Sequence, residues 1–203
     1  MARRKQKPAR VRPAEDVDDD LGFRRRRTAL RVRRKAGERA WELVHPRCAL
    51  ERGEDLEEVQ QMLDAGEIDV AIDEMRWLLN GCSDFVAAHR MLGEQALADG
   101  DLKLARGHFG YAYEIGLSAF PAGGLDAPLP YRLPANRPFL EAAKGLAWCL
   151  HELGKLKLAV RVVEQLLKLD PADPLNVRTW QDAWLREAAS ARGVEQGAEE
   201  AAG

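Results

Sequence analysis

Apolar residues recur at helical spacing through the middle of the chain. Between residues 84 and 117 they form two stripes, which the short polar turn Ala98-Asp99-Gly100-Asp101 separates. The stripes consist of Phe85, Val86, His89, Leu92, Gly93 and Ala96, and then of Leu102, Ala105, Phe109, Ala112 and Tyr113. Spacings of three and four residues line up on one face of a helix. The pattern therefore predicts a pair of helices, and Gly100 suits the end of the first because glycine adopts a positive φ at no steric cost.

The same pattern recurs with a period of 34 residues. Gly66 and Gly100 lie 34 residues apart, and each is followed by an apolar residue at +2 and an alanine at +5. The third copy starts at Gly154, which lies 54 residues after Gly100, or one period plus 20 residues. The extra residues are 118–137, whose prolines and glycines are incompatible with a helix. The sequence predicts three helical hairpins with an irregular insertion between the second and the third.

These elements divide the chain into a helical repeat domain and its flanks. The repeat domain covers residues 53–190, with units at 53–83, 84–117 and 138–171, the insertion at 118–137 and a cap at 172–190. The cap is an amphipathic segment with Leu175, Trp180, Trp184 and Leu185. The flanks are a basic tail at 1–35, a short helix and linker at 36–52 that begins near Ala36, and an acidic tail at 191–203. Both tails have few apolar residues, which predicts disorder.

The register of residues 53–190 resembles the tetratricopeptide repeat, a helix–turn–helix unit of 34 residues. The second unit matches best, through Leu92-Gly93, Gly100, Ala105, Phe109 and Ala112; the third matches through Leu146, Gly154, Ala159 and Pro171. The first unit matches mainly in its second helix, through Gly66, Ile68 and Ala71. The resemblance implies an all-α fold, a short right-handed α-solenoid of three helical hairpins with a C-terminal capping helix. It also implies a non-catalytic scaffold that binds a peptide or a partner helix in a concave groove.

The family's inward-facing positions translate into candidate groove residues. They are Ala87, Arg90, Glu94 and Leu97 in the second unit, Glu141, Lys144, Trp148 and His151 in the third, and Arg178 and Asp182 in the cap. Trp148 is the prominent candidate because exposed tryptophans are frequent binding anchors. The alternative for each position is a solvated helix face, and Trp148 has the further alternative of packing beneath the insertion. Arg90, Lys144 and Arg178 would suit capture of a C-terminal carboxylate, but the asparagines used for this in the family are missing.

The insertion contains enough apolar residues to pack against the helices, namely Leu125, Leu129, Tyr131 and Leu133. We therefore expect an ordered loop, with Tyr131 or Leu133 covering part of the groove near Trp148 or Lys144. Because the cost of loop closure grows only with the logarithm of loop length, we also expect the helices to form without it.

Charge separates the tail from the body. Residues 1–35 contain 14 Lys and Arg against 5 Asp and Glu, whereas residues 36–203 have a net charge of −11. The basic positions are Arg24, Arg25, Arg26, Arg27, Arg31, Arg33, Arg34 and Lys35. Such a tail could bind nucleic acid, an anionic membrane surface or an acidic protein, or it could contact only its own acidic body. The alternative function is thus a nucleic-acid-associated protein whose repeats are a docking platform.

Signatures of catalysis and of cofactor binding are missing from the sequence. There is no glycine-rich phosphate loop, HExxH helix or GxSxG turn, so we expect no enzyme and no cofactor. The competing hypothesis is an active site in the insertion that uses Asp126, Tyr131, Arg132 or Arg137 near Trp148. His45 and Cys48 have local spacing that suits a metal, but no second ligand pair accompanies them, so no metal site is expected.

The three cysteines, Cys48, Cys82 and Cys149, are odd in number and far apart. They suggest no disulfide framework, and we expect Cys82 and Cys149 to be small buried residues in a reducing cytoplasm. No apolar run approaches the roughly 20 residues that span a bilayer. No secretory signal follows the basic N-terminal residues.

Overall fold

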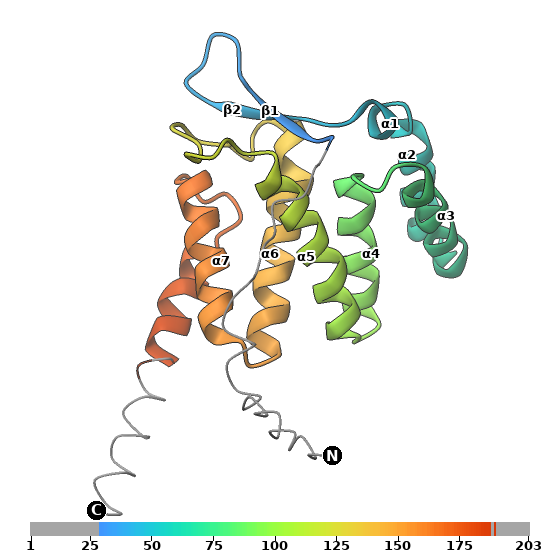
Figure 1. The fold of residues 1–203 in the computed structure, drawn as a ribbon. Coiled ribbons are helices and arrows are strands. Elements are labelled where there is room, and N and C mark those ends of the chain that lie inside the picture. The colour runs from blue at the N-terminus through green and yellow to red at the C-terminus, as the bar shows by residue number, and fades with distance from the viewer. Residues whose placement is uncertain (1–28, 188, 190–203) are drawn as a thin grey trace, which may run out of the picture.

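The computed structural model describes residues 29–187 and 189, and this part of the chain is mostly helical (Figure 1). A β-hairpin comes first, formed by β1 (Arg31–Arg34) and β2 (Trp41–Val44). The α-helices are α1 (Arg47–Leu50), α2 (Gly53–Asp64), α3 (Ile68–Gly81), α4 (Val86–Ala98), α5 (Leu102–Ser118), α6 (Arg137–Glu152) and α7 (Leu156–Leu169). A short 3-10 helix, η1 (Pro134–Asn136), precedes α6, and residues 178–187 form a further helix after α7.

Three pairs of adjacent helices follow one another along the molecule: α2 with α3, α4 with α5, and α6 with α7 (Figure 1). A glycine with positive φ stands in the turn of each pair: Gly66 at 80°, Gly100 at 78° and Gly154 at 72°. The next helix begins two residues after each glycine, at Ile68, Leu102 and Leu156. The predicted helical hairpins and their turns are confirmed.

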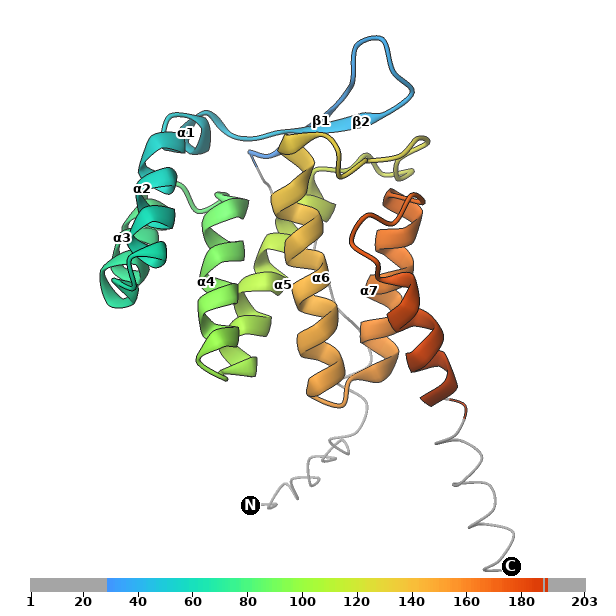
Figure 2. The ribbon, with the colours of Figure 1, turned by 180° about the vertical axis from the view of Figure 1, so that it is seen from behind.

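The helices lie in two layers, with α4, α6 and the helix at 178–187 on one side and α5 and α7 on the other (Figure 2). Phe109 of α5 fills the space where α4 and α6 meet it. A Cβ atom on Gly93 of α4 would lie 2.7 Å from the Phe109 ring, and one on Gly145 of α6 would lie 2.6 Å from it. The two glycines therefore allow α4 and α6 to approach the same aromatic ring.

Buried apolar residues form two separate clusters. The larger one spans α4 to α7 and includes Leu30 and Leu43 from the β-hairpin and Leu129 from the insertion. The smaller one joins α2 and α3 to the adjoining side of α4, and its buried residues are Ala49, Val59, Ala71, Met75, Leu78, Cys82, Phe85, Ala87, Ala88, Met91 and Leu92. The first hairpin thus has a core of its own, which it shares only with α4 and the residues around it.

The predictions of a disordered tail up to residue 35 and of a helix between residues 36 and 44 are wrong for the described residues 29–44. The segment expected to be a helix near Ala36 contains strand β2, which pairs antiparallel with β1, so that Arg34 lies opposite Trp41 and Arg31 opposite Val44. Distant contacts specify the strand, since the Trp41 N–H donates to the Pro128 carbonyl at 2.7 Å and the Leu43 N–H donates to the Asn136 side chain at 2.8 Å. Tertiary pairing therefore overrides the local helical spacing. The rest of the expected basic tail, 1–28, and the acidic tail, 191–203, lie outside the described residues.

The insertion is an ordered loop, as predicted, and it belongs to the core. Leu129 is fully buried, and its N–H donates to the Leu169 carbonyl at the end of α7, at 2.7 Å. The Tyr131 N–H donates to the Asp170 carboxylate at 2.8 Å. Asn136, also fully buried, donates to the carbonyls of Trp41 and Pro130. The loop therefore joins the β-hairpin above it to the end of α7.

A disulfide joins Cys48 to Cys82, with 5.7 Å between their Cα atoms, so the expectation of unpaired cysteines is wrong at these two positions. The hairpin of α2 and α3 returns the chain to α1, which brings together two residues 34 positions apart. Cys149 is a free, buried thiol, as expected. The cytoplasmic location, which partly depended on unpaired cysteines, stays a prediction. Within the described residues, no helix combines the length and the apolar character needed to cross a membrane.

Candidate functional site on the first-helix face

The predicted groove positions belong to α4, α6 and the helix at 178–187, and these three helices lie on the same side of the molecule (Figure 2). We call this side the first-helix face, because α4 and α6 are each the first helix of a hairpin. It is defined by Arg90, Glu94, Leu97, Glu141, Lys144, Trp148, His151 and Trp180. The face has a polar end near the insertion and an aromatic end near the terminal helix.

At the polar end, the Arg90 guanidinium lies close to two carboxylates. Arg90 pairs with Glu94 at 2.6 Å and lies 3.4 Å from a carboxylate oxygen of Glu141. The Tyr131 hydroxyl of the insertion donates to Glu141 at 2.6 Å. Desolvation raises the pKa of Glu94, although Arg90 opposes this shift. The insertion therefore covers the face at Glu141, which precedes the expected contacts Lys144 and Trp148 by about one and two helical turns.

At the aromatic end, four rings from α6 and the terminal helix pack together. The Trp148 and Trp180 ring centroids are 5.5 Å apart, Trp180 and Trp184 are 5.4 Å apart, and His151 stacks on Trp184 at 4.5 Å. The Lys144 ammonium lies 5.2 Å from the centre of the Trp180 ring. Trp184 is buried, whereas 38% of Trp148 is exposed. A tryptophan held by its neighbours and open to solvent is suited to anchor a ligand.

His151 connects the terminal helix to α6 by charge. Its two ring nitrogens lie 3.2 Å from Glu152 and 3.0 Å from Glu187, so the imidazolium can donate to both carboxylates. Desolvation disfavours the charged ring, but the hydrogen bonds to Glu187 and Glu152 outweigh it and raise the pKa of His151. The stabilisation of the folded state by the charged His151 ring is fully present below the unfolded pKa of about 6.5. It is lost as the pH rises through the raised pKa of the folded protein.

Other predicted groove residues do not converge on Trp148. Arg178 is exposed, and its guanidinium donates to the Pro171 carbonyl of its own loop at 3.4 Å. Leu97 is half-buried against the larger core cluster, and Ala87 is buried in the smaller one. Sequence reasoning missed Trp180 and Trp184 as parts of the site, although their spacing of four residues on an amphipathic segment was a usable signal.

The basic residues of the β-hairpin have acidic partners within the fold. Arg33 and Lys35 both pair with Glu42, at 2.7 and 3.1 Å. Arg34 pairs with Asp126 and lies 4.4 Å from the centre of the Trp41 ring. These internal pairs compete with phosphate binding at the same guanidinium and ammonium groups. Arg31 is exposed on β1, and Arg24, Arg25, Arg26 and Arg27 lie outside the described residues.

The residues of the hypothetical active site in the insertion each have a structural contact. Asp126 accepts from Arg34 and from the Trp41 indole, Arg132 pairs with Glu38, and Arg137 donates to the Tyr131 carbonyl. His45 contacts the Ala135 carbonyl at 2.7 Å, and burial lowers its pKa. His89 and His108 contact each other at 3.4 Å between α4 and α5. No three His, Cys, Asp or Glu side chains among the described residues are grouped so that they could hold a metal.

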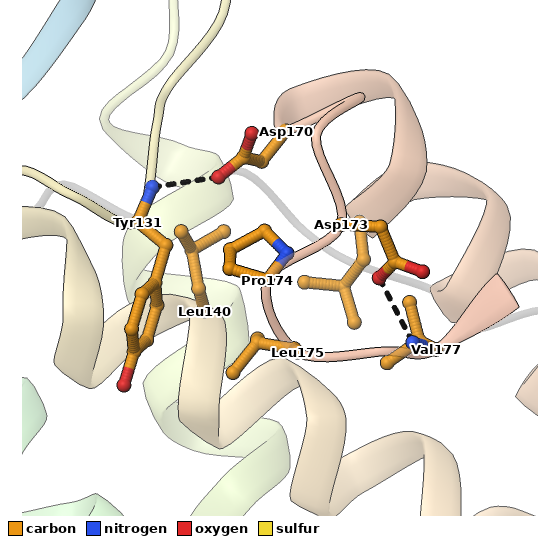
Figure 3. A pocket seen from close by; sticks show the side chains of 8 residues that line it. Tyr131, Leu140, Asp170, Asp173, Pro174, Leu175 and Val177 are labelled. Carbon is orange, nitrogen blue, oxygen red and sulfur yellow. Dashed lines mark hydrogen bonds between the residues drawn. The ribbon is translucent and has the colours of Figure 1, made fainter.

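A small hollow lies behind the insertion, between α6 and the loop after α7 (Figure 3). Its lining is mostly apolar and includes Leu140, Pro174 and Leu175. Its two carboxylates are engaged, since Asp170 accepts from the Tyr131 N–H and Asp173 accepts from the Val177 N–H (Figure 3). The hollow has a volume of about 210 Å³, part of which is open to solvent. We interpret it as a packing gap where the insertion meets the loop after α7.

No protein-family model matches the sequence, and no curated protein is significantly similar to it.

Proposed function

We propose that this protein is a non-catalytic interaction scaffold of the tetratricopeptide-repeat type, which binds a peptide or a partner helix on its first-helix face. Three helical hairpins with left-handed glycines in their turns support this proposal, as does the 34-residue period that remains when the insertion is set aside. Stacked helical hairpins present a broad surface to a ligand, and a protein partner suits such a surface.

The observation that carries the proposal is the exposed face of Trp148 within an ordered aromatic cluster. Trp180 supports one side of Trp148, and α6 holds its backbone, so little conformational entropy is lost when a ligand packs on the ring. The neighbouring Lys144 adds a cation beside the anchor. At the polar end, by contrast, Arg90 already pairs with Glu94 and lies beside Glu141. We therefore expect binding energy to be concentrated at the aromatic end.

The test is selection of binding peptides on the full-length protein from a random displayed library, followed by measurement of their affinities for two variants. In Trp148→Ala the affinity should fall about 30-fold or more, as is typical of an anchoring tryptophan. Trp77→Ala is the matched control, since Trp77 is 55% exposed but lies on α3, away from the first-helix face. Peptides that bind both variants equally well, or a selection that yields no binders, would contradict the proposal.

A further inference from the structure

The disulfide between Cys48 and Cys82 closes the chain around the first helical hairpin. Cys48 belongs to α1, Cys82 follows the last residue of α3, and α2 and α3 lie between them. Cys48 is partly exposed, whereas Cys82 is only 3% exposed. Cys48 is therefore the more exposed end of the bond, and Cys82 is the covered end.

Apart from this bond, the hairpin is held mainly by the smaller core cluster. Of the described residues, none between 47 and 85 contributes a buried side chain to the larger cluster. In the smaller cluster, buried residues of α2 and α3 pack together with Phe85, Ala88 and Met91, among others. Two of these three residues lie on α4, so the hairpin is docked on one helix of the body.

The hairpin also carries a concentrated negative charge. Residues 51–74 contain ten Asp and Glu but one basic residue, Arg52, which gives a net charge of −9. Within the described part of the chain, Glu51 pairs with Arg47 and Asp73 pairs with Arg76. Repulsion among so many like charges in two adjacent helices opposes the docked state. A covalent connection therefore contributes more here than in a hairpin with balanced charge.

We propose that the disulfide is a redox-controlled clamp: reduction by a dithiol releases the α2–α3 hairpin from α4, while α4 to α7 remain folded. In this reaction one thiolate of the reductant attacks the sulfur of Cys48, the more exposed end of the bond, and Cys82 leaves as a thiolate that takes up a proton. The second thiol of the reductant then displaces Cys48, also as a thiol. The reductant becomes a disulfide, and two electrons and two protons pass to the protein.

Cys149 takes no part in this exchange. It is buried in α6, and desolvation raises its pKa to about 11, so its reactive thiolate form is rare at neutral pH. Release of the hairpin would expose apolar side chains of α4, including Ala88 and Met91, which are covered in the oxidised protein. The clamp thus controls access to an apolar surface next to the first-helix face, whether or not that face binds a peptide.

Hydrogen exchange measured by mass spectrometry on the full-length protein tests the clamp. Peptides from residues 53–81 should exchange about 100-fold faster after treatment with dithiothreitol, because a disulfide that closes a loop of this size restricts local opening to about that extent. Peptides from residues 86–169 should be unchanged. Cys48→Ser should show the fast exchange without reductant, and Cys149→Ser should respond as the wild type does.

A thiol count provides a second measurement that does not depend on any variant. The denatured protein should present one reactive thiol before reduction and three after it, in agreement with one disulfide and the free Cys149. Three thiols before reduction would overturn the clamp. So would unchanged exchange in 53–81 after reduction, or an equal acceleration in 86–169.

Discussion

At the scale of single residues, close packing around Phe109 decides how α4, α5 and α6 fit together. The ring is almost fully buried, and two glycines, Gly93 and Gly145, face it from the two neighbouring helices. A methyl group at either position would approach the ring to less than 3 Å. Because the ring is packed from both sides, it cannot move away from one glycine without meeting the other helix.

We therefore expect Gly93→Ala and Gly145→Ala each to lower the free energy of unfolding by about 1–3 kcal/mol, the usual range for overpacking in a core. Chemical denaturation of the oxidised protein measures this change. Gly107→Ala is the matched control on α5, since a Cβ atom there meets nothing within 4 Å. It should stabilise the helix by up to about 1 kcal/mol. If all three substitutions had the same effect, the close approach would have no energetic consequence.

At the scale of elements, Asn136 joins strand β2 to the insertion, two segments that are distant in the sequence. Its side-chain oxygen accepts from the Leu43 N–H of β2, and its amide donates to the carbonyls of Trp41 and Pro130. The Asn136 side chain is fully buried. The amide thus satisfies backbone groups that would otherwise be buried without partners.

Asn136→Ala should destabilise the protein by about 2–4 kcal/mol, since a buried polar group that loses its partner costs about 1–3 kcal/mol and several are affected. The substitution should also accelerate hydrogen exchange more in the β-hairpin than in α7, and this difference measures its local effect. Asn80→Ala, an exposed substitution on α3, is the control and should change stability by less than about 0.5 kcal/mol. If hydrogen exchange in the β-hairpin were equally fast in the wild type and in Asn136→Ala, this role of Asn136 would be contradicted.

The same contacts explain how far the sequence predicts the elements. The helices from α4 to α7 follow from their apolar spacing and their turn glycines because these signals are local. Strand β2 does not, since in addition to its neighbour β1 it is held by Pro128 and Asn136, which lie more than 80 residues away. The disulfide was missed for a similar reason, because the fold of α2 and α3 brings its cysteines together.

In the candidate site, too, the features that depend on local sequence are predicted, and those that depend on distant contacts are not. The repeat register identifies Trp148 and Lys144 as surface positions, and both lie on the first-helix face. It does not identify Trp180 as the ring that supports Trp148, because that contact depends on the path of the chain after α7. The insertion likewise reaches Glu141 instead of Trp148, since its backbone is held by Asp170 and Leu169.

At the scale of the whole molecule, positive and negative charges are concentrated in different segments of the chain. Residues 51–74 have a net charge of −9, whereas residues 1–35 have a net charge of +9. The α2–α3 hairpin consequently folds against its own repulsion, with one disulfide and one small apolar cluster to hold it. Exposed ion pairs such as Arg47 with Glu51 contribute little at the surface.

Salt should therefore stabilise this hairpin, although it weakens individual surface ion pairs. At 0.5 M NaCl, screening over a few ångströms removes most of the repulsion among the exposed acids, because the Debye length falls from about 30 Å at 0.01 M to about 3 Å at 1 M. We expect peptides from residues 53–81 of the oxidised protein to exchange several-fold more slowly in 0.5 M than in 0.01 M NaCl. The double substitution Glu58→Gln and Asp69→Asn removes two exposed charges from the hairpin and should reduce this gain. Faster exchange at high salt would mean that attractive ion pairs dominate the hairpin, and the clamp would then act on an element that is stable without it.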